Sequence, residues 1–182
     1  ANRVLIVVDG VRMNNAIYRS GHLQNSITID PSNIERAEVI FGSSSVGYGS
    51  DAMGGVIHYY TKNPILKNSK KISSSFTSNF NSANNGVTNN FNTNYSSDNW
   101  GSITSISISK YGDIKMGKKR NHGYSNWGFT PIFSENSRYK FYAEPSINSD
   151  NNIQKNTGYS QVDLFQKFLF RIGDNNLLNL NI

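Results

Sequence analysis

The chain has 182 residues and a formal net charge of +6, and hydrophobic residues make up only 36% of it. This share is below that of an ordinary globular domain, so the chain is either partly disordered or a β-sheet in which every second residue is apolar. It contains no cysteine, which excludes disulfide bonds, thiolate metal sites and cysteine nucleophiles. No apolar run is long enough for a transmembrane helix, so any membrane crossing would need strands.

The charge is distributed unevenly along the chain. Up to Asn63, five Lys or Arg residues are balanced by five Asp or Glu residues, whereas thirteen stand against seven after it. This difference predicts two regions with different surroundings, residues 1–63 and 64–182. The chain begins without Met, directly before an apolar strand, and ends on an alternating Leu-Asn-Leu-Asn-Ile. We therefore expect a fragment of a longer protein.

The first region predicts a small globule of strands and short helical segments. Residues 4–8 form a continuous apolar run, which predicts a buried strand that ends in a turn at Asp9-Gly10. Asp30 and Pro31 predict the N-cap and first residue of a short helix. Further strands are expected at 37–41 and 56–61, with a Gly/Ser-rich turn segment at 42–55 between them.

The second region alternates apolar and polar residues, as expected for strands with two unlike faces. We expect about five antiparallel strands there. Ile106 and Ile108 alternate more weakly than the others, and Ile103 breaks their parity. The clearest apolar faces carry these residues: Ile72, Phe76 and Phe80; Val87, Phe91 and Tyr95; Val162, Leu164, Phe168, Phe170 and Ile172; Leu178, Leu180 and Ile182.

The connections favour a transmembrane β-barrel. Tight turns are expected at Asp98-Asn99 and at 173–176, and a long polar stretch lies near 112–156, matching the short periplasmic turns and long external loops of outer-membrane barrels. A soluble β-sandwich would also alternate. Three charged residues inside the last long strand, Asp163, Lys167 and Arg171, favour a water-filled lumen. Alternation by itself leaves barrel and sandwich open.

Three sequence blocks resemble the plug-domain core of TonB-dependent outer-membrane receptors: VLIVVDGVR at 4–12, IERAEVIFG at 34–42, and SSVGYGSDAMGGVI at 44–57, which Thr61-Lys62 follows. Two positions depart from the family. Phe41-Gly42-Ser43 stands where Arg-Gly-Pro is usual, and Gly47 where an apolar residue is usual.

The resemblance implies an α+β plug globule (residues 1–63) followed by the first antiparallel strands of a large transmembrane β-barrel (residues 64–182). It also implies a transporter in the bacterial outer membrane that catalyses no reaction. Such a receptor contacts membrane lipid and couples to TonB, through a motif that we expect outside this segment.

The segment 19–31 is similar to the plug of haem and haemoglobin receptors. There a Gly-His-Leu motif, matched by Gly21-His22-Leu23, implies that His22 offers an axial imidazole to haem iron. Arg12, Tyr18 and Arg19 are candidates for contacts with the haem propionates, or equally for contacts within the protein. His22 could also be an ordinary hydrogen-bonding loop residue. We interpret His58 as structural and assign His122, in the expected external loop, no role.

Two other signals lack the context they need. Residues 47–52 match G-x-G-x-x-A, but the expected strand after them leaves no room for the helix of a dinucleotide site. The basic residues 115–120 lack aromatic stacking partners for nucleic acid, so no nucleic-acid partner is expected. The sequence thus favours a receptor for haem or a haemoprotein. The alternatives are a ferric-siderophore or other nutrient receptor of the same family, and a soluble β-rich adhesin or binding module.

Overall fold

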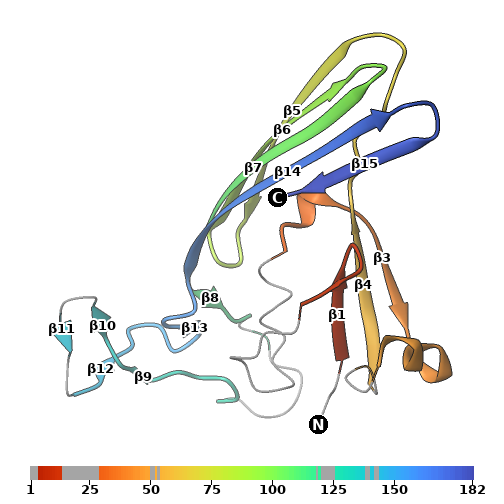
Figure 1. Cartoon of the computed structure of the whole chain (residues 1–182). Coiled ribbons are helices and arrows are strands. Elements are labelled where there is room, and N and C mark those ends of the chain that lie inside the picture. Colours follow the sequence, from red (N-terminus) through yellow and green to blue (C-terminus); the bar gives the residue numbers. More distant parts are fainter. Residues whose placement is uncertain are drawn as a thin grey trace. The chain divides into compact units, whose positions relative to one another are not determined.

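The computed structural model describes residues 4–13, 29–49, 52, 54–117, 119, 126–137, 140–141 and 144–182 (Figure 1). The chain divides into two compact units: residues 1–75, 92–105 and 164–182 in one, and residues 76–91 and 106–163 in the other. The division passes through four long strands, so each of these strands contributes to both units.

The first region forms a four-stranded mixed sheet. Its strands β1 (Val4–Val8), β2 (Val11–Arg12), β3 (Ile34–Ile40) and β4 (Gly55–Thr61) follow the order β2-β1-β4-β3. β1 runs parallel to β4, and the other pairs are antiparallel. The buried core consists of Leu5, Val7, Ala52 and Val56. The continuous apolar run of β1 is thus central, as its sequence predicts.

The Asp9-Gly10 turn joins β1 to β2 as predicted. Both residues have positive φ, 46° for Asp9 and 86° for Gly10, and Val8 pairs with Val11 across the two-residue connection. Asp and Gly are among the few residues that adopt this backbone conformation readily. The turn therefore leaves the Asp9 carboxylate at the end of the sheet.

The helical segments of the described residues are 3-10 helices, η1 (Pro31–Asn33) and η2 (Gly42–Tyr48). The predicted cap is confirmed, because the amide of Ser32 donates to Oδ1 of Asp30 at 2.9 Å. The expected helix is only one turn long. Ile34 already has extended backbone angles (φ −81°, ψ 130°) and enters β3. The predicted turn segment 42–55 begins as η2 rather than as a turn.

The second region contains a five-stranded sheet with the order β15-β14-β7-β6-β5. The turns at 97–99 and 173–175 lie where the sequence predicts them, and a third short turn occupies 82–85. Phe168 and Phe170 of β14 pair with Leu180 and Leu178 of β15, so these apolar residues share a face. The strands are β5 (Lys71–Asn81), β6 (Gly86–Ser96), β7 (Trp100–Tyr111), β14 (Tyr159–Ile172) and β15 (Asn176–Asn181).

The long stretch between β7 and β14 carries regular structure that the sequence does not predict. Among the described residues of this stretch, three short antiparallel ladders form. Each strand has two residues, which is too short for alternation to be detected. The ladders pair β8 (Ile114–Lys115) with β13 (Ile153–Gln154), β9 (Ile132–Phe133) with β12 (Ser146–Ile147), and β10 (Asn136–Ser137) with β11 (Lys140–Phe141).

Candidate functional site

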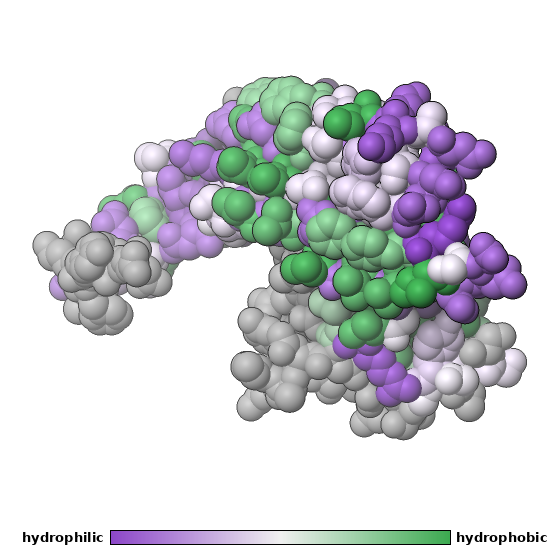
Figure 2. All heavy atoms as spheres, turned by 45° about the horizontal axis from the view of Figure 1, so that its top comes forward, coloured by the Kyte–Doolittle hydropathy of each residue, from purple (hydrophilic) through white to green (hydrophobic). Residues whose placement is uncertain are grey.

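The five-stranded sheet exposes its apolar side chains and buries polar ones. The large residues that the alternation places on the apolar face are exposed on every strand, and hydrophobic residues are visible at the surface in Figure 2. The exposed members are Ile72, Phe76, Phe80, Val87, Phe91, Trp100, Ile106, Ile108, Val162, Leu164, Ile172, Leu178, Leu180 and Ile182. The buried polar members are Asn90, Asn92, Ser105, Ser107, Ser109 and Lys167.

This arrangement is the reverse of a water-soluble sheet, which covers its apolar face. The buried polar face is internally bonded, as in the 2.7 Å hydrogen bond from the Asn90 amide to Ser107 Oγ. The structure explains why Ile103 breaks the alternation of β7. Ile103 is buried and lies on the same face of the strand as Ser105 and Ser107. A sheet with this distribution is suited to a non-aqueous medium on its apolar side.

An aromatic cluster lies near the turn end of the apolar face. The rings of Tyr95 and Trp100 are 4.4 Å apart between centroids, Trp100 lies 6.4 Å from Phe170, and Phe170 lies 6.0 Å from Phe168. These residues flank the 97–99 and 173–175 turns. Aromatic residues in this position are typical of strands at a membrane–water boundary.

A polar junction connects β14 with the four-stranded sheet inside the first unit. Nζ of Lys167 lies 2.9 Å from Oδ2 of Asp9 and donates to Oδ1 of Asn63 at 2.9 Å. Thr61 donates to Asp9 from its backbone and its hydroxyl. Burial of the carboxylate would raise the pKa of Asp9, but the Thr61 and Lys167 hydrogen bonds outweigh it and hold the pKa below its ordinary value.

This junction corrects one expectation. Lys167 does lie on the polar face of β14, but it is 1% exposed and paired, not solvated by a water-filled lumen. Thr61 and Asn63 have roles that sequence reasoning missed. Their one signal was position, since Thr61 ends the last strand of the first region and Asn63 directly precedes the second.

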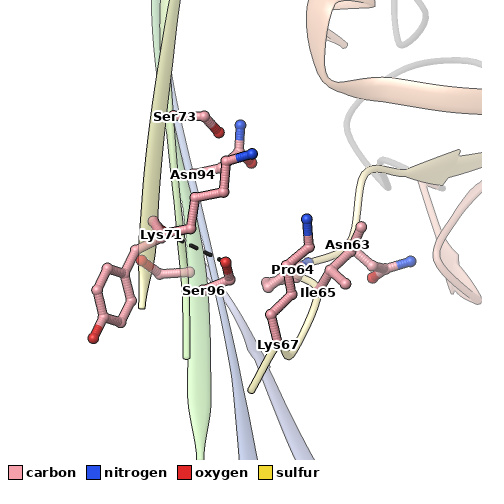
Figure 3. A pocket seen from close by; sticks show the side chains of 10 residues that line it. Asn63, Pro64, Ile65, Lys67, Lys71, Ser73, Asn94 and Ser96 are labelled. Carbon is pink, nitrogen blue, oxygen red and sulfur yellow. Dashed lines mark hydrogen bonds between the residues drawn. The ribbon is translucent and has the colours of Figure 1, made fainter. Parts of the chain in front are cut away.

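A pocket of about 280 Å³ lies beside this junction, and all of its lining residues belong to the first unit. Residues Asn63, Pro64, Ile65 and Lys67 form one side, and Lys71, Ser73, Asn94 and Ser96 form the other (Figure 3). A Cβ on Gly101 would come within 3.2 Å of the Ile65 carbonyl oxygen, so glycine lets the 63–67 segment cross β7 closely. The lining holds two lysines and no carboxylate, which favours anions over cations.

The structure covers only one of the four predicted haem-contacting residues. Arg12 is exposed, and its guanidinium passes close to Gly49, where a Cβ would lie 3.3 Å from Nη2. Tyr18, Arg19 and His22 lie outside the described residues, as does His122, so their roles stay predictions.

His58 is buried on β4 and bonded within the sheet. The Gly10 amide donates to its Nε2 at 3.1 Å, and its ring stacks on Tyr60 at 4.0 Å between centroids. Because Nε2 accepts this bond, its lone pair is occupied and the ring is held under the Asp9-Gly10 turn. These contacts agree with the structural role predicted for His58.

The segment between β7 and β14 is organised around Asn148. Its buried side-chain amide donates to the carbonyl oxygens of Thr130 and Ile153 at 2.7 and 2.9 Å. Nearby, Asp150 accepts hydrogen bonds from Asn152 and forms an ion pair with Lys115 at 3.2 Å, and these contacts lower the pKa of Asp150 to about 2. This polar stretch is therefore ordered by side-chain bonds to its own backbone.

Among the described residues, no group of three or more His, Cys, Asp or Glu side chains is arranged to hold a metal ion. Among the same residues, no helix has the length and apolar character needed to cross a membrane.

Comparison with protein families gives a match over β1, β2, β3 and the first two residues of β4. Residues 1–56 match the family described as TonB-dependent Receptor Plug Domain. Receptors of this family are transporters of the bacterial outer membrane and are not enzymes, as the resemblance implies.

Relatives of this plug segment include receptors with different named ligands. The "Hemin receptor" of Yersinia enterocolitica is 47% identical over 58 residues, which are 32% of this chain and 8% of the receptor. The "Heme/hemopexin utilization protein C" of Haemophilus influenzae is 40% identical over 86 residues, or 46% of this chain and 11% of that protein. The "Rhizobactin receptor" of Rhizobium meliloti is 48% identical over 58 residues, which are 32% of this chain and 7% of that receptor. The chain thus spans about a tenth of each relative.

A solved structure resembles the chain over nearly its whole length. The siderophore receptor PirA from Pseudomonas aeruginosa superposes with a TM-score of 0.50 and 20% identity, covering 98% of this chain and 25% of that one. At this identity the likeness concerns the fold. It supports a plug-domain region followed by antiparallel β-sheet.

Proposed function

We propose that this chain is part of a TonB-dependent transporter that takes up an iron-bearing ligand across the outer membrane. In this proposal residues 1–63 belong to the plug and residues 64–182 form the first strands of the transmembrane barrel. The observation that carries it is the five-stranded sheet, whose apolar residues are exposed while polar ones are buried, directly after a plug segment.

The strand dimensions support the membrane assignment. β5, β6, β7 and β14 have 11, 11, 12 and 14 residues, enough for tilted strands to cross a bilayer, which needs about 9–11. β5 and β15 are the outer strands of the sheet. Open strand edges are not viable in lipid, so further strands would complete the barrel.

The connections also support it. If β5 runs outward, the turns at 97–99 and 173–175 lie on the periplasmic side, while the turn at 82–85 and residues 112–158 lie outside. The long polar segment is then an external loop, the usual place for long connections in such barrels. Its ladders and the Asn148 hydrogen bonds give this loop a defined shape.

We further propose haem or a haemoprotein as the ligand, on the strength of the Gly21-His22-Leu23 match. In this assignment His22 would supply an axial imidazole, and Arg12, Tyr18 and Arg19 would approach the propionates. A ferric siderophore is the second candidate, because plug segments of siderophore receptors are as similar to this chain as those of haem receptors. TonB and outer-membrane lipid are the other proposed partners.

Haemin binding by the full-length receptor in detergent tests the ligand. Haemin should produce a Soret band characteristic of imidazole ligation, and His22→Ala should abolish it. His122→Ala is the matched control, because it removes a histidine that is expected in the external loop and not in the plug. This variant should leave the Soret band unchanged. An unchanged band in His22→Ala would remove the haem assignment and leave the siderophore receptor as the better candidate.

Cell fractionation tests the transport class independently. The full-length protein should be recovered with outer membranes and extracted only by detergent. Recovery as a soluble protein would overturn the transporter assignment and favour the third reading, a soluble β-rich adhesin.

A further inference from the structure

Lys167 is a buried cation in a strand whose other residues are exposed or half-buried. Its side chain is 2% exposed, and its two described polar partners both come from the first region, Asp9 at 2.9 Å and Asn63 at 2.9 Å. An ammonium group is costly to bury unless it is paired and hydrogen-bonded. The position of β14 and that of the Asp9 turn are therefore energetically linked.

The two sides of this contact are built differently. Asp9 is also held by its own sheet, because Oδ1 accepts the Thr61 amide at 2.9 Å and Oδ2 accepts the Thr61 hydroxyl at 2.6 Å. If Lys167 withdrew, the carboxylate would keep both Thr61 bonds. The ammonium would lose both of its acceptors, so only entry of water could compensate it.

We propose that the Asp9–Lys167 ion pair is a releasable tether between the plug and the barrel strand β14, and that it must open for cargo to pass. This rests on the transport function proposed above. Lys167 is a positioning residue: it touches no cargo, and it acts by holding Asp9 and the adjoining ends of β1 and β4. The Lys167 ammonium is buried in the closed pair and would be stabilised by hydration in the open state, so a conformational change that admits water would release it.

The same strand offers a matched control pair. Arg171, four residues further along β14, lies 2.8 Å from Asp98 in an exposed ion pair that joins β14 only to the neighbouring 97–99 turn. Its backbone amide also donates to Asn99, within the same sheet. Loss of the Arg171 charge should therefore leave the plug contact intact, whereas loss of the Lys167 charge should not.

The test uses the full-length receptor in cells, with Lys167→Met, Arg171→Met and Lys167→Arg, which keeps the positive charge. Two rates are measured at matched receptor levels in the outer membrane: haemin uptake, and entry of vancomycin, an antibiotic too large for ordinary porins. Lys167→Met should raise vancomycin entry at least about fivefold, a change within the range for coupled contacts. Arg171→Met should match the wild type, and Lys167→Arg should retain much of the barrier.

Hydrogen exchange on the purified receptor separates a tether from general destabilisation. In Lys167→Met, amides of residues 4–13 and 55–63 should exchange faster, while those of 164–172 keep their wild-type rates. Equal vancomycin entry and equal exchange in Lys167→Met and wild type would overturn the tether. Absence of haemin or ferric-siderophore uptake by the wild type would instead overturn the proposed function, while the exchange result would still report on the contact.

Discussion

The two sheets of this chain bury opposite kinds of side chain. In the four-stranded sheet, Leu5, Val7 and Val56 are almost completely buried and form an ordinary apolar core. In the five-stranded sheet, residues of the same kind, such as Leu164 and Ile108, are more than half exposed, and serines, asparagines and a lysine are buried. Successive side chains point to opposite faces in both sheets, but the four-stranded sheet packs apolar residues into a core, whereas the five-stranded sheet leaves many of them exposed.

This contrast shows why composition alone is a poor guide to this chain. A low hydrophobic share suggests disorder if one core is assumed. A sheet can stay ordered with this low hydrophobic share if it needs apolar residues on one face only. Asn and Ser side chains on its other face form hydrogen bonds with one another. Hydrogen bonds such as that from Asn90 to Ser107 replace the apolar contacts of a soluble core.

The largest expected effect on stability is the difference between truncating a buried and an exposed apolar residue. Leu5→Ala should lower the free energy of unfolding of the plug region by about 2–5 kcal/mol, since it leaves a cavity in a closed core. Leu164→Ala, at an exposed site, should cost less than about 1 kcal/mol. Thermal unfolding of the receptor in detergent measures both, and equal losses would contradict the proposed difference in surroundings.

Two neighbouring, exposed residues of β5 can test whether the apolar face of the five-stranded sheet contacts lipid. Phe76→Arg should lower folding stability in lipid vesicles by about 2–4 kcal/mol, because it places a charge on the lipid-facing side. Thr77→Arg lies on the opposite face and should be tolerated. The folded fraction is measured by the gel mobility of unheated samples. If both variants fold like the wild type, the sheet faces water on both sides, as in a soluble protein.

Sequence patterns predicted most of the long strands and turns, because each of these elements is determined by residues that are adjacent in the chain. The β1 strand, the Asp9-Gly10 turn and the Asp30 cap each depend on a few adjacent residues, and all three are confirmed. The long strands were found by their period of two. The short ladders between β7 and β14 were missed, since two residues carry no period.

Contacts between distant residues could not be predicted in this way. Parity placed Lys167 on the polar face of β14, but no pattern in the sequence relates it to Asp9 or Asn63. Ile103 broke the alternation for a reason visible only in three dimensions, namely that it is buried on the polar side. His22 was identified by the Gly21-His22-Leu23 motif, and Tyr18 and Arg19 were selected as candidate contacts for the haem propionates; these roles stay predictions.

A smaller effect is expected at the Asp30 helix cap of the plug region. Asp30→Ala removes the acceptor of the Ser32 amide and should cost about 0.5–2 kcal/mol. Asp30→Asn keeps an acceptor oxygen and should retain most of the stability. Thermal unfolding of the two variants side by side gives the comparison. A loss in Asp30→Asn as large as in Asp30→Ala would show that the charge or the second carboxylate oxygen, which accepts the Asn33 side-chain amide at 3.2 Å, matters more than the bond to Ser32.

The smallest expected effect concerns the polar segment between β7 and β14, where order depends on partly buried hydrogen bonds. Side-chain and backbone hydrogen bonds from Asn152, together with Lys115, hold the pKa of Asp150 at about 2, below its ordinary value of 3.8. A carboxyl with a lowered pKa contributes stability that is complete above its unfolded pKa and is lost as pH falls through the folded value. The turn at 150–153 should therefore stay ordered down to about pH 4 and loosen between about pH 4 and 2, while both sheets persist.

Titration of the Asp150 carboxyl and the Asn152 amide by NMR measures this shift. Lys115→Met removes the ion pair but leaves both Asn152 bonds, so it should raise the pKa of Asp150 only part of the way toward its ordinary value. A full return in Lys115→Met would show that the ion pair, and not the Asn152 hydrogen bonds, orders this turn. That outcome would make the segment sensitive to salt, unlike the plug, where the Asp9 pair is shielded from solvent.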